Sequence, residues 1–195
     1  MVSVQQEYKN MNLVQIGTNK SKDDFLSIVK SLNKKDIKNL ILVEPLSYLN
    51  SIIENCYLGF DYKIENLVIT DDESKTKVKF FISSRHDWLS SISKKHIEKH
   101  IGNVELKEKE IGCLTLNNLF KKHNLKKIDI LFIDAEGFDD KLIMSIDFDY
   151  FDIEKIYYED VHIDNDKLKQ FLINKGYTVN KTNFKDNLTS LATKL

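Results

Sequence analysis

Short apolar runs alternate with amphipathic stretches along most of the chain. Unbroken apolar runs are typical of strands buried on both faces of a parallel sheet, and apolar residues three or four apart predict helices. On this basis we expect strands at residues 12–16, 39–43, 62–69, 77–82, 128–133, 153–158, 177–181 and 188–194. We expect helices at residues 22–32, from Pro45 onward, between 88 and 101, and at 115–123, 139–146 and 167–174.

The alternation of strands and helices predicts an α/β fold with a doubly wound, mostly parallel sheet. The last two strands, joined by a polar turn at 183–187, predict a C-terminal antiparallel hairpin. Ser21 is the expected N-cap of the first helix, in a capping-box pattern with Asp24, and Pro45 suits the first turn of the second helix. Residues 83–112 are the least regular part, and we expect a lid or substrate-binding insert there.

Composition narrows the class of protein further. The 195 residues are 42% hydrophobic, which fits one domain over 1–195 with 1–11 as a short polar lead. The charges nearly cancel, to a net −1, so we expect no nucleic-acid or membrane partner. Cys56 and Cys113 lie too far apart for a zinc knuckle or a redox pair. We see neither an apolar signal core nor a run of roughly 18 apolar residues, and we therefore expect the protein in the cytoplasm. The oligomeric state is not predicted.

Polar residues follow five of the predicted strands, at the end where ligands bind in doubly wound sheets. These strand ends are 15–19, Glu44, 66–72, 134–137 and 159–162. Gly17 permits a sharp turn with positive φ or a close backbone approach to a ligand, because it has no Cβ. Glu44 follows Gly17 by 27 positions, close to the roughly 20 at which an acid binds the ribose in such folds. A carboxylate suits ribose because it can accept hydrogen bonds from both hydroxyls.

The glycine pattern limits the choice of nucleoside. A dinucleotide site uses Gly-x-Gly-x-x-Gly, and Gly17 has no partner glycine at either position, which disfavours an NAD-dependent oxidoreductase. A Walker-type Gly-Lys-Ser or Gly-Lys-Thr loop is absent as well. S-adenosylmethionine has a ribose and no phosphate, so one turn glycine with polar neighbours is enough for it.

Six segments, taken in order, resemble the FkbM-type methyltransferases. They are Val-Gln-Ile-Gly-Thr-Asn at 14–19, Val-Glu-Pro at 43–45, Asn-Leu-Val-Ile at 66–69, Leu-Thr-Leu at 114–116, a strand with Asp-Ala-Glu-Gly at 128–137, and Tyr-Glu-Asp-Val-His at 158–162. The resemblance implies a class I methyltransferase-like Rossmann fold, S-adenosylmethionine as the cofactor, and mostly O-methylation of a sugar, glycan or other small acceptor. The cofactor-binding residues that we infer are Gln15, Gly17, Thr18, Asn19, Glu44 and Asn66.

Methyl transfer needs an acceptor oxygen in line with the sulfonium carbon and a group that takes its proton. The candidate catalytic residues are Asp134, Glu136, Glu159 and His162. The resemblance and the strand-end positions imply that Asp134 and Glu136 face the acceptor. His162 is the preferred general base, because its unperturbed pKa of about 6.5 lies near working pH. Asp134 could instead hold a divalent metal ion, Glu136 could cap the next helix, and His162 could belong to a surface loop.

Two features of the middle region have competing interpretations. Arg85, the only arginine, lies near Trp88 and could grip an acidic or sugar acceptor, or make one structural salt bridge. His96 and His100 have the spacing of a zinc-protease helix, but the intervening glutamate is third rather than second and no third ligand is evident. We therefore expect no metal at these two histidines.

The chain departs from the family pattern at two positions in the first loop. Gln15 stands where the family usually has Asp, and Ser21 stands where a second glycine usually closes the turn. Gln15 can hydrogen-bond a cofactor, but it cannot offer a charge to the amino group. These departures leave an alternative, a catalytically degenerate nucleoside-binding or scaffolding protein on the same fold.

Overall fold

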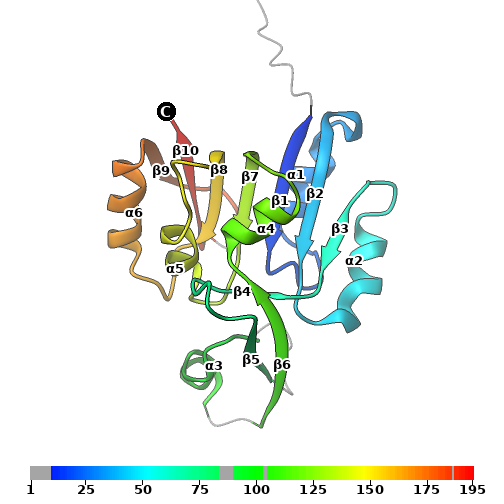
Figure 1. The fold of residues 1–195 in the computed structure, drawn as a ribbon, viewed down its shortest axis with the longest axis vertical. Helices are drawn as coiled ribbons and strands as arrows, with labels where there is room; N and C mark the ends of the chain where they lie inside the picture. The colour runs from blue at the N-terminus through cyan, green and yellow to red at the C-terminus, as the bar shows by residue number, and fades with distance from the viewer. Residues whose placement is uncertain (1–9, 84–89, 103–104, 186) are drawn as a thin grey trace, which may run out of the picture.

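A seven-stranded sheet forms the centre of the computed structural model, which describes residues 10–83, 90–102, 105–185 and 187–195 (Figure 1). The strand order is β3-β2-β1-β7-β8-β10-β9. The strands are β1 (Met11–Ile16), β2 (Ile37–Val43), β3 (Lys63–Glu65), β7 (Lys127–Ile133), β8 (Asp152–Glu159), β9 (Tyr177–Lys181) and β10 (Thr189–Lys194). Neighbours from β3 to β8 pair in parallel, and β10 pairs antiparallel with β8 and β9. The predicted α/β class, with a mostly parallel sheet and a late antiparallel pair, is confirmed.

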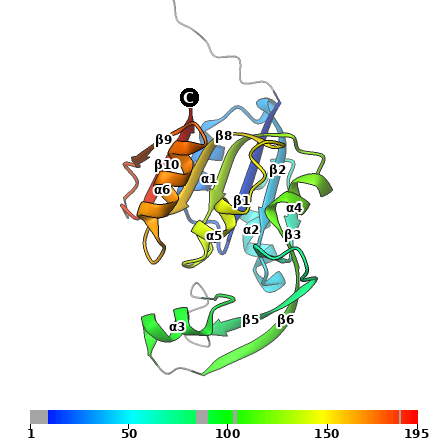
Figure 2. The same cartoon turned by 60° about the vertical axis from the view of Figure 1, so that its left-hand side comes forward.

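Helices cover both faces of this main sheet (Figures 1 and 2). One face carries α1 (Asp24–Ser31) and α2 (Asn50–Cys56), and the other carries α4 (Leu116–Lys122), α5 (Asp139–Met144) and α6 (Asn165–Asn174). Strand β1 contributes to both layers, because Leu13 packs with the first group and Val14 with the second. Burial on both faces explains why the strands read as unbroken apolar runs.

A smaller sheet lies beyond the carboxyl ends of the main strands (Figure 2). It contains β4 (Val68–Ile69), β5 (Lys77–Ser83) and β6 (Leu106–Leu114) in the order β4-β6-β5, and α3 (Lys94–Ile101) comes before β6. We call residues 68–114 the insert. Among the described residues, no helix is both long and apolar enough to cross a membrane.

One strand prediction in this region is wrong, and one strand was missed. Residues 62–69 form two strands rather than one, since the chain leaves the main sheet after β3 and enters the small sheet at β4. Strand β6 was not predicted at all, because residues 107–110 are exposed and charged and so lack an apolar alternation. Its partner β5 supplies matching lysines, and both Lys77–Glu110 and Lys79–Glu108 lie at 3.3 Å.

Two helix starts also differ from the prediction. Asp23, rather than Ser21, is the N-cap of α1, and its Oδ1 accepts a hydrogen bond from Leu26 N at 3.0 Å. Ser21 belongs to the preceding loop, with a φ of +52°. Pro45 lies before a short 3-10 turn, Ser47–Leu49, and α2 begins only after this turn.

Candidate active site

The turn after β1 is fixed by the two neighbouring strands. Gly17 has a φ of +78°, and its N–H donates to Val43 O at the end of β2 at 3.0 Å. A Cβ on Gly17 would lie 1.9 Å from Asp134 O at the end of β7. The close approach that the sequence predicted is therefore to another strand end, and glycine is required there by the fold itself.

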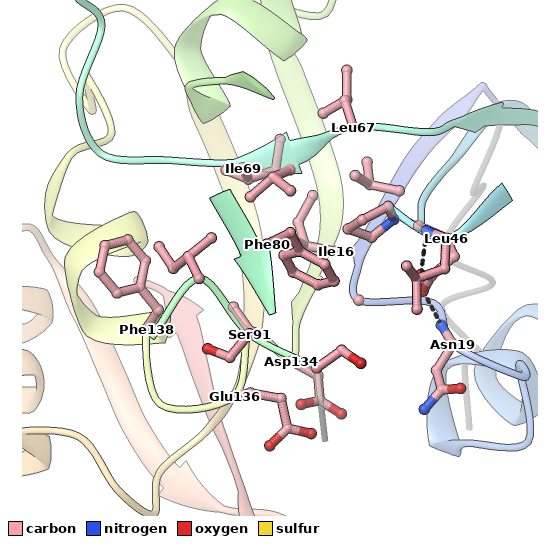
Figure 3. A pocket seen from close by; sticks show the side chains of 18 of the residues that line it. Ile16, Asn19, Leu46, Leu67, Ile69, Phe80, Ser91, Asp134, Glu136 and Phe138 are labelled. Carbon is pink, nitrogen blue, oxygen red and sulfur yellow. Dashed lines mark hydrogen bonds between the residues drawn. The ribbon is translucent and has the colours of Figure 1, made fainter. Parts of the chain in front are cut away.

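Glu44 holds the loop after β1 from the end of β2. Its Oε2 accepts a hydrogen bond from Asn19 N at 2.8 Å, and its Oε1 accepts one from Leu46 N at 2.9 Å (Figure 3). The residue is 5% exposed. Two backbone donors thus fix the orientation of a carboxylate at the edge of the sheet where ligands bind in this architecture.

A pocket with a cavity volume of about 90 Å³ lies beside this carboxylate (Figure 3). The ends of β1 and β2 supply Gly17, Asn19 and Glu44, and the β7–α5 loop supplies Asp134 and Glu136. Its apolar wall includes Leu46, Leu67, Ile69, Phe80 and Phe138. An apolar wall with a few convergent polar groups is the usual form of a small-molecule site. We call it the first pocket.

Three of the six predicted cofactor residues, Gly17, Asn19 and Glu44, line the first pocket, and the others do not. Thr18 is buried, and its hydroxyl donates to Val43 O at 3.3 Å. Asn66 is exposed, and its Nδ2 donates to Glu44 O at 2.8 Å. Thr18 and Asn66 are therefore attached to the framework around Glu44 rather than to the pocket wall.

Gln15 is fully buried below the loop that follows β1. Its Nε2 donates to Asp23 Oδ2 at 2.6 Å, and its Oε1 accepts from the Tyr57 hydroxyl at 3.2 Å. Gln15 lines neither pocket described here. Its side chain supports Asp23, which the sequence analysis treated only as part of the helix start.

A second pocket adjoins the first at the ends of β7 and β8. Asp134 and Glu136 line both pockets, whereas Asp23, Glu159 and His162 line only the second. All four predicted catalytic residues therefore surround one cavity, although they come from two separate strand ends. The predicted alternative for Glu136 does not occur, because α5 has Phe138 as its N-cap and no side-chain cap.

Carboxylates gather around the second pocket. The pKa of Asp134 is raised well above its usual value, first by desolvation and then by repulsion from Asp139, Glu136, Glu159 and Asp23. Although the Asp134 side chain is exposed to the pockets, protein surrounds it on most sides and the neighbouring charges share its sign. A positively charged ligand would relieve this repulsion.

Asp139 ties the two strand-end loops together, and the sequence analysis missed it. Its Oδ2 accepts from Ala135 N at 3.0 Å, and its Oδ1 accepts from Glu159 N at 3.1 Å. Burial raises the pKa of Asp139, and the two N–H groups oppose that shift. The sequence shows it only as one of two acids at the start of a helix, so no local signal marks its bonding role.

Helix α3 of the insert contacts the site through His96. Gly137 has a φ of +78°, and a Cβ there would lie 2.7 Å from Nδ1 and Cε1 of His96. The His96 Nε2 lies 3.5 Å from Glu136 Oε2. The glycine of the Asp-Ala-Glu-Gly segment thus gives the imidazole room to lie against the β7–α5 loop.

Three histidines meet where α3 faces the second pocket. The ring centroids of His100 and His162 are 4.2 Å apart, and those of His96 and His162 are 5.7 Å apart. Desolvation, together with the neighbouring imidazoles, lowers the pKa of His100 and of His162. Both rings are therefore neutral at pH 7, as a general base must be.

No metal centre is evident from these side chains. In the parts of the chain that the structure describes, no three His, Cys, Asp or Glu residues are grouped so that they could hold a metal ion. The predicted acceptor-binding pair, Arg85 and Trp88, lies outside the described residues.

Comparison with known proteins identifies the family of this chain. Residues 15–179 match the methyltransferase FkbM domain. The fold is similar to the crystal structure of the CurJ carbon methyltransferase, with 8% identity and a TM-score of 0.49 over 96% of this chain and 49% of that chain, so this chain spans about half its length. No curated protein sequence matches significantly. Because the family match covers most of the sequence, this chain belongs to the FkbM methyltransferase family.

Proposed function

We propose that the protein transfers a methyl group from S-adenosylmethionine to a hydroxyl of a sugar, glycan or other small polar acceptor. Membership of the family supports the methyl donor. The observation that carries the proposal is the Glu44 carboxylate, held by two backbone N–H groups at the wall of an apolar pocket. This arrangement suits a nucleoside, whose hydroxyls donate and whose base is largely apolar.

The residues that are present fit this cofactor in two further respects. Asn19 lines the first pocket, and its Oδ1 is buried without a hydrogen-bond partner among the described residues, so a ligand donor would satisfy it. Desolvation first, and repulsion from neighbouring carboxylates second, raise the pKa of Asp134, so a cationic group bound beside it would be favoured. S-adenosylmethionine carries two cationic groups, and it supplies an electrophilic methyl group when bound.

The second pocket supports an acceptor that has a proton to lose. His162, kept neutral by its surroundings, would accept the hydroxyl proton at a ring nitrogen. Asp134 and Glu136 line both pockets, so they would orient the hydroxyl where donor and acceptor meet. Glu159 would accept a hydrogen bond from a neighbouring hydroxyl. The insert, lying over the carboxyl ends of the strands, would help to exclude water.

Calorimetric titration with S-adenosylmethionine and S-adenosylhomocysteine tests the nucleoside pocket. We expect micromolar binding to the wild type and at least tenfold weaker binding to Glu44→Gln, which is about 1.4 kcal/mol. Glu54→Gln removes an exposed carboxylate from α2 and should leave the affinity unchanged. Thermal melting establishes that both variants are folded. A folded wild-type protein that binds neither compound would contradict the proposal.

Transfer to an acceptor is tested separately, with labelled S-adenosylmethionine and a panel of mono- and disaccharides. Incorporation into a hydroxyl-bearing compound, with a slower rate in His162→Asn, is the expected result. Tight cofactor binding without transfer to any member of a broad panel would favour the degenerate nucleoside-binding protein.

A further inference from the structure

A chain of hydrogen bonds runs from the protein core to the second pocket. The buried Tyr57 hydroxyl donates to Gln15 Oε1, and Gln15 Nε2 donates to Asp23 Oδ2. Because an ionised carboxylate only accepts hydrogen bonds, Gln15 must turn its amide N–H₂ toward Asp23 and its oxygen toward Tyr57. These hydrogen bonds therefore determine the orientation of the Gln15 amide. The amide in turn holds the Asp23 side chain in one position.

Asp23 is secured from its other side as well. Its Oδ1 accepts from Leu26 N at 3.0 Å, as the N-cap of α1. It makes no ion pair with any described residue, although Lys22 and Lys185 line the same pocket. Asp134 also lines this pocket, and the Asp23 charge is one cause of its raised pKa. Asp23 and Asp134, two of the five carboxylates that line this pocket, therefore face one cavity without a paired cation among the described residues.

The order of the acidic residues across the two pockets matches the order of groups along the cofactor. Glu44 lines only the first pocket, Asp134 lines both, and Asp23 lines only the second. S-adenosylmethionine runs from adenine through ribose and sulfonium to an amino acid. If Glu44 binds the ribose, the sulfonium falls near Asp134 and the amino-acid end falls near Asp23.

We propose that Asp23, positioned by Gln15, binds the ammonium group at the amino-acid end of the cofactor. An ammonium group offers three N–H donors and a positive charge, whereas a sulfonium has no N–H donor. The charge that is missing at Gln15 is thus supplied from eight positions further along the loop. This inference rests on the proposed function and names a further residue of the same site.

The test compares two ligands that differ at the amino-acid end. S-adenosylhomocysteine has the adenosine and the amino acid, and 5′-methylthioadenosine has the adenosine alone. Asp23→Asn keeps the N-cap, because Asn caps helices as well as Asp does, and removes the charge. We expect it to weaken S-adenosylhomocysteine binding by 10- to 100-fold and to change methylthioadenosine binding by less than twofold.

Asp61→Asn is the matched control, because it removes an equal charge from an exposed position that lines neither pocket. Both ligands should bind this variant within twofold of the wild type, and thermal melting checks that each variant is folded. Equal weakening of both ligands by Asp23→Asn, or no weakening of either, would overturn the assignment. A wild type that binds neither ligand would instead contradict the nucleoside pocket itself, and the assignment with it.

Discussion

The main sheet and the insert contribute to the site in different ways. In the main sheet, backbone contacts between strand ends fix the loops, as the 1.9 Å position of a Gly17 Cβ against Asp134 O illustrates. In the insert, α3 reaches the site through side chains, chiefly His96 against Gly137. A backbone held between two neighbouring strand ends cannot shift easily, whereas an imidazole at the end of a side chain can.

The two regions also carry titratable groups whose pKa values shift in opposite directions. Asp134 and Asp139 of the main sheet have raised pKa values. His100 of the insert and His162, which contacts it, have lowered pKa values. In both cases the folded protein disfavours the charged form. The acids therefore weaken the fold as pH rises, and the histidines weaken the docking of α3 as pH falls.

The largest effect should come from adding one methyl group at each of two glycines with the same φ of +78°. Gly17→Ala forces a Cβ onto the Asp134 backbone and should lower the free energy of unfolding by about 4 kcal/mol or more, if the protein folds at all. Gly137→Ala meets a movable His96 ring, so it should cost about 1–2 kcal/mol, the usual penalty for a left-handed Ala. Urea denaturation measures both. Equal losses would show that the insert is as rigid as the sheet.

The same contrast explains how much of the fold could be predicted from the sequence. Strands such as β2 and β7 are buried on both faces, so their apolar runs identify them without tertiary information. Strand β6 has an exposed, charged first half, and its pairing with β5 depends on partners about thirty residues away in the chain. Its sequence therefore gave no periodic signal.

Residues of the candidate site could be predicted only where they directly follow a strand. Glu44 and Asp134 follow apolar strands, and both line the first pocket. The support that Gln15 gives to Asp23 needs a loop that folds back on the strand, and the contact between His100 and His162 needs α3 to lie over the sheet. Neither follows from residue type or spacing.

Matched cavity mutations should separate the stability of the two regions. Leu119 in α4 and Ile97 in α3 are both fully buried. Leu119→Ala should lower the free energy of global unfolding by about 3 kcal/mol, because it opens a cavity in the main core. Ile97→Ala should mainly accelerate amide hydrogen exchange in α3, with a smaller shift of the urea midpoint, because α3 can open locally. Uniformly faster exchange throughout the Ile97→Ala protein would contradict this division.

Removing one repulsive charge should stabilise the sheet and weaken the site. The pKa of Asp134 is raised in the folded protein, so its protonated form contributes to stability at low pH. This contribution is lost as pH rises through the folded-state pKa. Asp134→Asn should therefore raise the free energy of unfolding of the ligand-free protein at pH 7 by about 1 kcal/mol. It should also weaken S-adenosylmethionine binding, because the sulfonium loses a nearby negative charge. Glu73→Gln, at an exposed position in the insert, should change neither quantity.

If Asp134→Asn instead destabilises the ligand-free protein, the carboxylate makes a stabilising contact in the fold, and its charge is not a source of net repulsion. The unfolding measurements are made by urea titration at pH 5 and pH 7. The stabilisation should be smaller at pH 5, where the carboxyl is already partly protonated.

The smallest effect should be the response of α3 to pH. The pKa values of His100 and His162 lie below the usual 6.5, so the docked state loses stability as pH falls from about 6.5 toward the folded-state values. His96 and Lys99 add to this repulsion and Glu136 opposes it. Hydrogen exchange of α3 amides, corrected for the intrinsic rate, should accelerate a few-fold between pH 7 and pH 5.

Amides of β7 serve as the internal control for this last measurement, because the cluster of His96, His100 and His162 belongs to α3 and the loop after β8. His162→Asn should flatten the pH response of α3 and leave the exchange of β7 as it was. Exchange in α3 that stays constant from pH 7 to pH 5 would mean that apolar packing around Ile97, rather than the imidazole cluster, determines how the insert is held over the site.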